Sequence, residues 1–268
     1  MKCYEIPTTR LFRELVVNLA MGIPWIRRRR LKSLRTSHGS IEIEAAKIIA
    51  EFDFFASSIG SLEGLVIAEI GPGDAVGLAP MLISSGAVSY FAIDRFLGDV
   101  WGERANELYR ELERQRGPFI DGWRNRVVLH PASIEAPSEG LAQFDVIISF
   151  DVIEHLADVS PAVRNMVSLL KPDGRMIHRV DYGAHGIWST AEDPLIFLEL
   201  PNWLWRAMGS NRGYPNRVPH SEFIRLLQAS NLTVAERVTR SCGPTVLDAE
   251  IACGFAADPS LGPEFHLE

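Results

Sequence analysis

Four residues in the first part of the chain, Glu69, Gly71, Gly73 and Asp94, have types and spacing suited to holding a nucleoside. Glycines that follow a buried strand let the backbone turn sharply and pass close to a ligand. A carboxylate at the end of the next strand can accept hydrogen bonds from both hydroxyls of a ribose. The spacing therefore predicts a cofactor that contains a nucleoside, and it leaves open which one.

Two short apolar runs position these residues. Leu65–Ile70 is typical of a buried parallel strand and ends at the glycine turn. A helical pattern of apolar residues follows as far as Ile83, and Ala87–Ile93 predicts a second strand that ends at Asp94. This order of strand, turn, helix and strand brings the glycines and the carboxylate to one edge of a sheet.

The rest of the chain continues the alternation of strands and helices. Further strands are predicted at residues 126–130, 144–150, 175–180, 232–240 and 250–257, and helices at residues 41–55, 100–116, 157–170 and 220–230. No helix separates the last two strands, so we expect them to pair antiparallel. The expected fold is a doubly wound, Rossmann-like α/β fold whose mostly parallel, seven-stranded sheet has an antiparallel last strand.

The predicted organisation is a helical arm over residues 1–40 followed by one α/β domain over residues 41–268. Within that domain, residues 181–219 form an unusually long connection that contains three tryptophans, and such connections are uncommon unless they are functional. Because the connection follows the carboxyl end of a strand, we expect it to cover the ligand site and to recognise the substrate.

Composition narrows the class of protein. The 268 residues have a formal net charge of −7 and are 47% hydrophobic, which is typical of a soluble globular protein and disfavours nucleic acid as a partner. The three cysteines, Cys3, Cys242 and Cys253, have no metal-ligand spacing, so we predict a reduced cytoplasmic protein without a metal site.

The amino-terminal arm has an apolar stretch, Leu15–Ile26, that leads into Arg27–Arg30. A secretory signal has its basic residues before the apolar stretch, so this order disfavours one. We expect an amphipathic lid helix followed by a solvated basic turn. The alternative is peripheral association with an anionic membrane, which would place the protein at the inner face of that membrane.

A second block of motifs identifies the nucleoside. Val76 stands where a dinucleotide fingerprint needs its third glycine, which disfavours a nicotinamide-dependent oxidoreductase. Phe144–Leu156 and Leu169–Gly174 complete an ordered set of motifs. With this set, residues 63–181 resemble the class I S-adenosylmethionine-dependent methyltransferases. Two departures are Ala75, at the third glycine of the first motif, and residues 131–135, which lack an acidic residue at the position often used to contact adenine.

The resemblance implies that S-adenosylmethionine is the cofactor, and it implies a role for each matching residue. Gly71 and Gly73 would approach the methionine part of the cofactor, and Glu69 would organise the ammonium group of that part. Asp94 would hold the ribose hydroxyls, Arg95 and Phe96 would flank the adenine, and Ser133 or the Ile134 backbone would contact the adenine. Phe150 and Asp151 would lie near the sulfonium. Alternatively, Glu69 only braces the turn and Phe96 is an ordinary core residue.

A hydroxyl acceptor must lose a proton as it attacks the methyl group, which calls for a base or a metal ion. His178, Asp181 and His155 are the candidates, together with His185. The alternatives are a buried core role for His178 and a capping role for His155. A looser similarity in residues 178–181, 203–205 and 209–212 to bacterial methyltransferases of surface-polysaccharide assembly suggests a small-molecule or glycan acceptor that contains sugar. Methylation of nitrogen or carbon, or a non-catalytic binding role, remain open alternatives.

Overall fold

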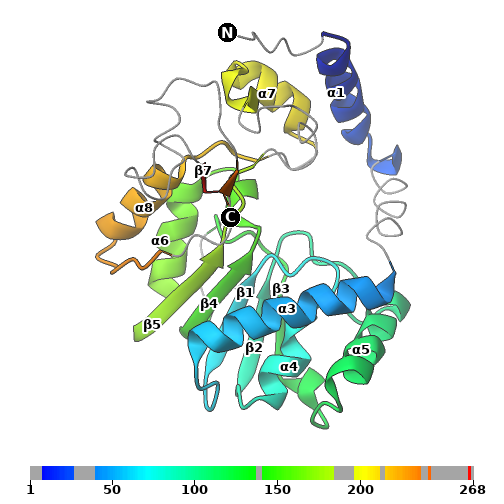
Figure 1. Cartoon of the computed structure of the whole chain (residues 1–268), viewed down its shortest axis with the longest axis vertical. Coiled ribbons are helices and arrows are strands. Elements are labelled where there is room, and N and C mark those ends of the chain that lie inside the picture. The colour runs from blue at the N-terminus through cyan, green and yellow to red at the C-terminus, as the bar shows by residue number, and fades with distance from the viewer. Residues whose placement is uncertain are drawn as a thin grey trace. The chain divides into compact units, whose positions relative to one another are not determined.

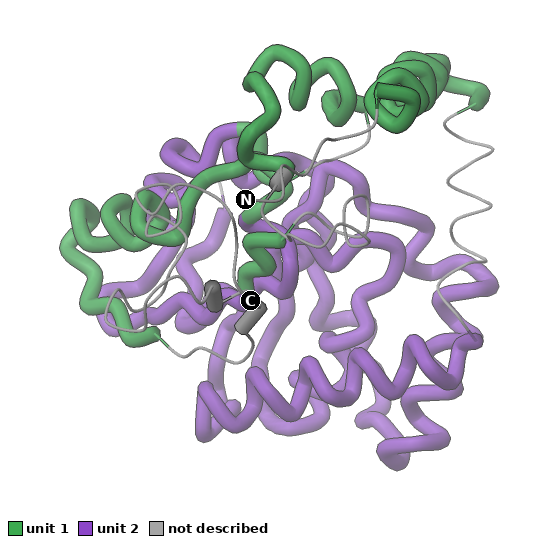
Figure 2. The backbone as a smooth tube through the Cα atoms, turned by 45° about the horizontal axis from the view of Figure 1, so that its top comes forward, with its two compact units in different colours: residues 1–37, 154–157, 180–268 green, residues 38–153, 158–179 purple. Residues whose placement is uncertain are grey.

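The computed structural model describes residues 8–26, 40–136, 141–183, 196–211, 215–236, 241–242 and 265–266. The chain divides into two compact units, which Figure 2 shows in different colours. The sheet unit consists of residues 38–153 and 158–179, and the helical unit consists of residues 1–37, 154–157 and 180–268. The predicted arm over residues 1–40 and domain over residues 41–268 stay a prediction.

The sheet unit is built on five parallel strands, and it confirms the predicted Rossmann-like α/β fold for this part of the chain (Figure 1). Their order is β3-β2-β1-β4-β5, so the chain runs outward from β1 to one side and then resumes on the other side. Ligands of such sheets bind where the strand order reverses, at the carboxyl ends of the strands. The strands are β1 (Val66–Ile70), β2 (Ser89–Ile93), β3 (Val127–His130), β4 (Phe144–Phe150) and β5 (Leu170–Arg179).

Three helices, α3 (Ile41–Ile59), α4 (Leu78–Ser84) and α5 (Glu103–Arg116), pack with one face of the sheet into the main core. This core contains fully buried side chains from every layer, including Phe55, Leu82, Leu112, Ile67 and Tyr90. The sheet unit also contains α6 (Val159–Leu169), which begins at its cap Asp158. The carboxyl ends of β1 and β2 are therefore held by a dense apolar layer.

The strand β5 begins at Leu170, whereas the sequence predicts a start at Arg175. The prediction was wrong because Lys171–Gly174 has the composition of a turn. In the structure this segment forms an irregular entry into the strand, with a shift of register opposite Phe144 and Val146. Such an irregularity accommodates Pro172, which has no N–H to donate to a ladder.

The remaining predicted strands have different outcomes. Residues 232–236 are not a strand, so the predicted strand at 232–240 is wrong over this part, and residues 237–240 and 250–257 lie outside the described residues. Two short strands, β6 (Ser241–Cys242) and β7 (Phe265–His266), pair antiparallel in a separate sheet. The sixth and seventh strands of a single sheet stay a prediction.

The helical unit contains α1 (Thr8–Met21), α7 (Asn202–Gly209) and α8 (His220–Ala229). The sequence places the first of these at residues 15–26; the helix instead begins earlier and ends before Gly22 and Pro24, which do not favour continuation. Asn18 joins α1 to α7, because its Nδ2 donates to the carbonyl of Ala207 (2.7 Å). Among the described residues, no helix is long and apolar enough to cross a membrane.

The glycine turn after β1 has a left-handed backbone at two positions. Gly71 has φ +74° and Gly73 has φ +75°. A Cβ atom at Gly71 would lie 2.6 Å from Cγ2 of Val152, whereas a Cβ atom at Gly73 would have no atom within 4 Å. Gly71 is therefore required for packing against the chain after β4, and Gly73 borders open space.

These surroundings predict that Gly71→Ala destabilises the fold more than Gly73→Ala does. Both variants place a Cβ atom in a left-handed conformation, at a cost of about 1–2 kcal/mol. Only Gly71→Ala adds a steric overlap, worth about 1–3 kcal/mol more. Urea unfolding of the two variants measures the difference, and equal losses of unfolding free energy would contradict the packing described for Gly71.

Candidate active site

Glu69 is a buried acid inside the parallel sheet. It lies near the end of β1, and it accepts a hydrogen bond from the hydroxyl of Tyr90 on the neighbouring strand β2. Burial raises the pKa of Glu69 to about 8, although the Tyr90 hydrogen bond lowers it. The carboxyl is braced by a side chain of the sheet.

A second acid with a raised pKa, Glu51, acts on Glu69 through its charge. The pKa of Glu51, on α3, is raised to about 7, chiefly by burial; the charge of Asp151 contributes to this rise and the charge of Arg179 opposes it. The charges of Glu51 and Asp94 also raise the pKa of Glu69. A cation placed beside these carboxyls would stabilise their ionised forms. Sequence reasoning missed Glu51, which lies on a helix and has no motif to identify it.

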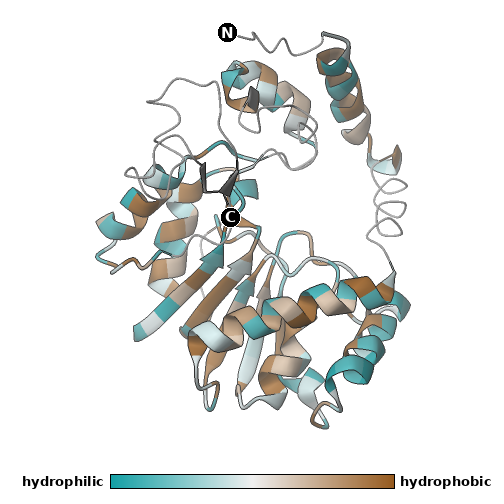
Figure 3. Cartoon of the chain, in the orientation of Figure 1, coloured by the Kyte–Doolittle hydropathy of each residue, from teal (hydrophilic) through white to brown (hydrophobic). Residues whose placement is uncertain are grey.

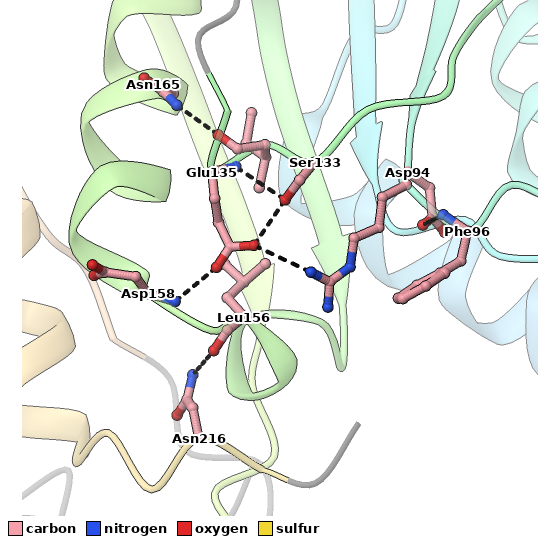
Figure 4. Close-up of polar contacts among 10 residues, drawn as sticks. Asp94, Phe96, Ser133, Glu135, Leu156, Asp158, Asn165 and Asn216 are labelled. Atoms are coloured by element: carbon pink, nitrogen blue, oxygen red, sulfur yellow. Dashed lines mark hydrogen bonds and ion pairs between the residues drawn. The ribbon is translucent and has the colours of Figure 1, made fainter. Parts of the chain in front are cut away.

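Asp94 follows β2, where the sequence predicts it, and its carboxylate is oriented by two backbone amides. Oδ2 accepts a hydrogen bond from the N–H of Gly73 (3.0 Å), and Oδ1 accepts one from the N–H of Phe96 (2.7 Å; Figure 4). The glycine turn and the carboxylate thus form one hydrogen-bonded structure. The side chain is half-buried.

The chain after Asp94 lies beside the segment after β3. The guanidinium of Arg95 stacks on the ring of Phe96, with its carbon 4.6 Å from the ring centroid, and forms an ion pair with Glu135 (3.8 Å; Figure 4). Phe96 is 57% exposed, so the alternative that it is a core residue is wrong. An exposed aromatic ring such as this one is suited to stacking on a flat ring of a ligand.

Glu135 makes several hydrogen bonds that hold the segment of residues 131–135, which follows β3. Its Oε2 accepts a hydrogen bond from the hydroxyl of Ser133 (2.8 Å), and its Oε1 accepts one from the N–H of Asp158 (2.7 Å). The Ile134 side chain is buried, and its carbonyl accepts a hydrogen bond from Asn165 (2.8 Å). Glu135 therefore holds this segment together, a role that sequence reasoning did not assign to it.

The end of β4 carries a strained acid. Asp151 has φ +54°, in a region that favours glycine, and its N–H donates to the carbonyl of Arg179 (3.0 Å). Its Oδ2 accepts from Arg179 Nη2 (3.2 Å), and the Arg179 guanidinium carbon lies 3.9 Å from the Phe150 ring centroid. Phe150, Asp151 and Arg179 therefore form one cluster at the carboxyl ends of β4 and β5. Arg179 was not predicted as a site residue.

His178 lies within β5, opposite Ser149 of β4. Its Nδ1 is 2.7 Å from the Ser149 hydroxyl, which is fully buried. Burial lowers the pKa of His178 to about 4, so the ring is neutral near pH 7 and is a weaker base than an exposed imidazole.

The other two candidate bases belong to the helical unit. His155 ends a short 3₁₀ helix, Ile153–His155, and Asp181 follows β5. The Asp181 carboxylate accepts from the N–H of Gly183 (2.8 Å), and the N–H of Asp181 donates to the buried Glu154 (3.3 Å). His185 lies outside the described residues. The roles of His155, His178 and Asp181 stay a prediction.

The long connection over residues 181–219 contains two tryptophans, Trp203 and Trp205, whose surroundings the structure describes. Trp205 is buried and donates from Nε1 to the carbonyl of Pro215 (2.8 Å), so it serves the core of the helical unit, whereas Trp203 is exposed. Trp188 and Arg212 lie outside the described residues. Within the described ranges, no group of three His, Cys, Asp or Glu side chains could hold a metal ion.

The raised pKa of Glu69 predicts a loss of stability as pH increases. Below its ordinary pKa of 4.5 the acid is protonated in both states, and between 4.5 and about 8 only the unfolded chain ionises it. The stability that protonated Glu69 contributes at low pH is therefore lost progressively as the pH rises from 4.5, and the loss is complete above about 8. Glu69→Gln cannot ionise, so its unfolding free energy should fall less over this range.

Urea unfolding at about pH 5 and about pH 8 measures this difference. Glu51 contributes in the same direction up to about pH 7, so Glu69→Gln should flatten the decline only in part. Glu107→Gln, at an exposed position on α5, is the matched control and should follow the wild type. A decline of wild-type size in Glu69→Gln would refute the buried neutral acid.

Comparisons with known proteins agree with this geometry. The model of a methyltransferase domain family matches residues 45–237. The chain is 33% identical over 129 residues to a ubiquinone biosynthesis O-methyltransferase of Caulobacter vibrioides, covering 48% of this chain and 45% of that protein. It is 29% identical over 180 residues to the protein of the same name from Sinorhizobium medicae, covering 66% and 63%. The chain thus spans less than two thirds of either relative.

Among solved structures, YcgJ of Bacillus subtilis is 20% identical, with 68% of each chain covered and a TM-score of 0.44. The family match covers well over half of the chain and includes every residue of the candidate cofactor site. The chain therefore belongs to this methyltransferase domain family.

Proposed function

We propose that this protein transfers the methyl group of S-adenosylmethionine to a hydroxyl oxygen of a small molecule. The acceptor contains a sugar or is related to a sugar-containing compound. The observation that carries the cofactor half of the proposal is the Asp94 carboxylate, held by the Gly73 and Phe96 amides beside a buried acid. The two curated relatives support transfer to oxygen, because both are named O-methyltransferases.

The residues of the sheet unit fit the cofactor. Asp94 would accept hydrogen bonds from the ribose hydroxyls, and the open space beside Gly73 would let the backbone approach the methionine part. Glu69 and Glu51 would face positive charge, which would draw both acids into their ionised forms. Phe96 would stack on the adenine, and Phe150 with Asp151 would lie toward the sulfonium. When bound, S-adenosylmethionine supplies a methyl group that is already activated.

Alignment and exclusion of water are the main tasks left to the protein. A hydroxyl acceptor also needs a group to receive its proton, and we assign this role to the set of His178, Asp181 and His155. Because His178 is neutral at pH 7, it can accept a proton without first losing one. Its low pKa makes it a weak base, so Asp181 and His155 are tested beside it.

The acceptor class has two candidates. The sugar-containing acceptor relies on the looser sequence similarity described above, together with an exposed Trp203 that could stack on a sugar face. The second candidate is a phenolic acceptor related to a quinone, and the names of the two curated relatives favour it. We propose a cytoplasmic enzyme in both cases, with no nucleic acid partner.

Asp94→Asn should weaken binding of S-adenosylhomocysteine about ten- to a hundredfold, because an amide replaces the charged acceptor of the ribose hydrogen bonds. Isothermal titration measures the dissociation constant. Asp121→Asn, an exposed change before the 3₁₀ helix Trp123–Arg126, should leave the constant unchanged. Unchanged affinity in Asp94→Asn would remove the central support of the cofactor site.

The nature of the acceptor can be tested with His178→Ala. For a hydroxyl acceptor, loss of the base should lower kcat about a hundredfold or more. The readout is formation of S-adenosylhomocysteine with a panel of sugars, glycans and phenols, and Asp181→Ala and His155→Ala are assayed in parallel.

Binding of S-adenosylhomocysteine to each of these variants is the control for folding. Wild-type kcat in all three variants would contradict base-assisted transfer to oxygen and favour a nitrogen or carbon acceptor that needs no deprotonation.

A further inference from the structure

One side of α1 exposes a continuous row of apolar side chains. Phe12, Val16 and Leu19 recur at spacings of four and three residues, which places them on one side of α1, and Ile23 continues the spacing just beyond the end of the helix. Phe12 is 69% exposed and Leu19 is 70% exposed, and Trp25 beyond the helix is exposed as well. We call these five residues the apolar stripe. Figure 3 shows the alternation of hydropathy along α1.

The opposite side of α1 already has a partner. Its buried residues are Glu14, Asn18 and Met21, which share their own side of the helix. Asn18 makes hydrogen bonds with α7 and with the residues that follow it: its Nδ2 donates to Ser210 (3.1 Å), and its Oδ1 accepts from the N–H of Asn211 (2.8 Å). The helix is therefore held by the side that carries Glu14, Asn18 and Met21, and the apolar stripe is not used to hold it to α7.

The sequence around the apolar stripe has a charge opposite to that of the whole chain. Residues 8–35 contain eight arginines and lysines and one acidic residue, a formal charge of +7, whereas the whole chain has −7. Arg10 and Arg13 lie on α1 itself, and Arg27–Arg30 follow in the sequence. Basic residues concentrated next to exposed apolar side chains are typical of helices that lie on anionic membranes.

A second copy of this chain fits the stripe less well. In a two-fold dimer the same surface of both copies meets, so two segments of charge +7 would be brought together and would repel. An anionic bilayer offers the complementary charge and an apolar layer for Phe12, Leu19 and Trp25. Tryptophan is enriched at this boundary between headgroups and hydrocarbon.

We propose that α1 is a membrane-surface helix that inserts its apolar stripe into the headgroup region of an anionic bilayer. The stripe contributes contact with the hydrocarbon boundary, and the arginines contribute attraction to the anionic lipids. This inference does not depend on the acceptor of the methyl group.

The test uses the full chain and flotation with vesicles. Vesicles of phosphatidylcholine that contain phosphatidylglycerol should bind the protein, vesicles of phosphatidylcholine alone should bind it weakly, and high salt should release it. Phe12→Gln and Leu19→Gln should each weaken binding to the anionic vesicles about tenfold, because each removes one large apolar side chain from the boundary.

Ile43→Gln is the matched control, because Ile43 is 52% exposed on α3 and lies outside the apolar stripe. It should bind vesicles as the wild type does. All variants should keep wild-type affinity for S-adenosylhomocysteine, which shows that the fold is intact.

Two outcomes would overturn the proposal. The first is binding that is equal for both kinds of vesicle or unchanged in Phe12→Gln and Leu19→Gln. The second is a wild-type dimer in gel filtration that Leu19→Gln converts to a monomer, with no effect of that change on flotation. This result would assign the stripe to a second copy of the chain.

Discussion

The site depends on a carboxyl group that the fold keeps away from water. Glu69 lies inside the sheet, where a charge is costly, and it accepts a hydrogen bond from the hydroxyl of Tyr90 on the next strand. Nearby acids, Glu51 and Asp94, make ionisation still less favourable. A cationic ligand would reverse this balance, because the carboxylate would then have a partner of opposite charge. The sheet thus holds an acid whose preferred charge depends on a bound cation.

The second element of the site is built from backbone. Two main-chain amides fix Asp94, and one of them belongs to Gly73 in the turn after β1. Gly71 is packed against Val152, so the turn is also held by the chain after β4. Moving any one of these segments would move the carboxylate. This coupling explains why the motif includes two glycines and an acid separated by about twenty residues in the sequence.

Much of the sheet unit could be predicted from the sequence, because its strands are buried and read as short apolar runs. The start of β5 could not, since Lys171–Gly174 has the composition of a turn and enters the ladder only through an irregular register with Phe144. The partner of Glu69 was not predicted either, because Tyr90 faces it through strand pairing and not through any motif. Glu51 acts across space from a helix, so no local pattern identifies it. The strands expected after α8 relied on weaker alternation, and residues 232–236 do not form one.

The same chain uses charge in two different ways. In the sheet unit, Glu69 is buried near the carboxyl end of β1 and Glu51 lies half-buried on α3, and low solvation would strengthen the response of both acids to a cation. In the sequence of the helical unit, arginines are concentrated in and after α1, and under the membrane proposal their combined charge would supply the attraction to anionic lipids. A negative net charge would keep the protein away from an anionic bilayer unless the basic residues were gathered in one segment. The concentration of basic residues in the sequence beside an exposed apolar row is the basis of the proposal that α1 contacts a membrane surface.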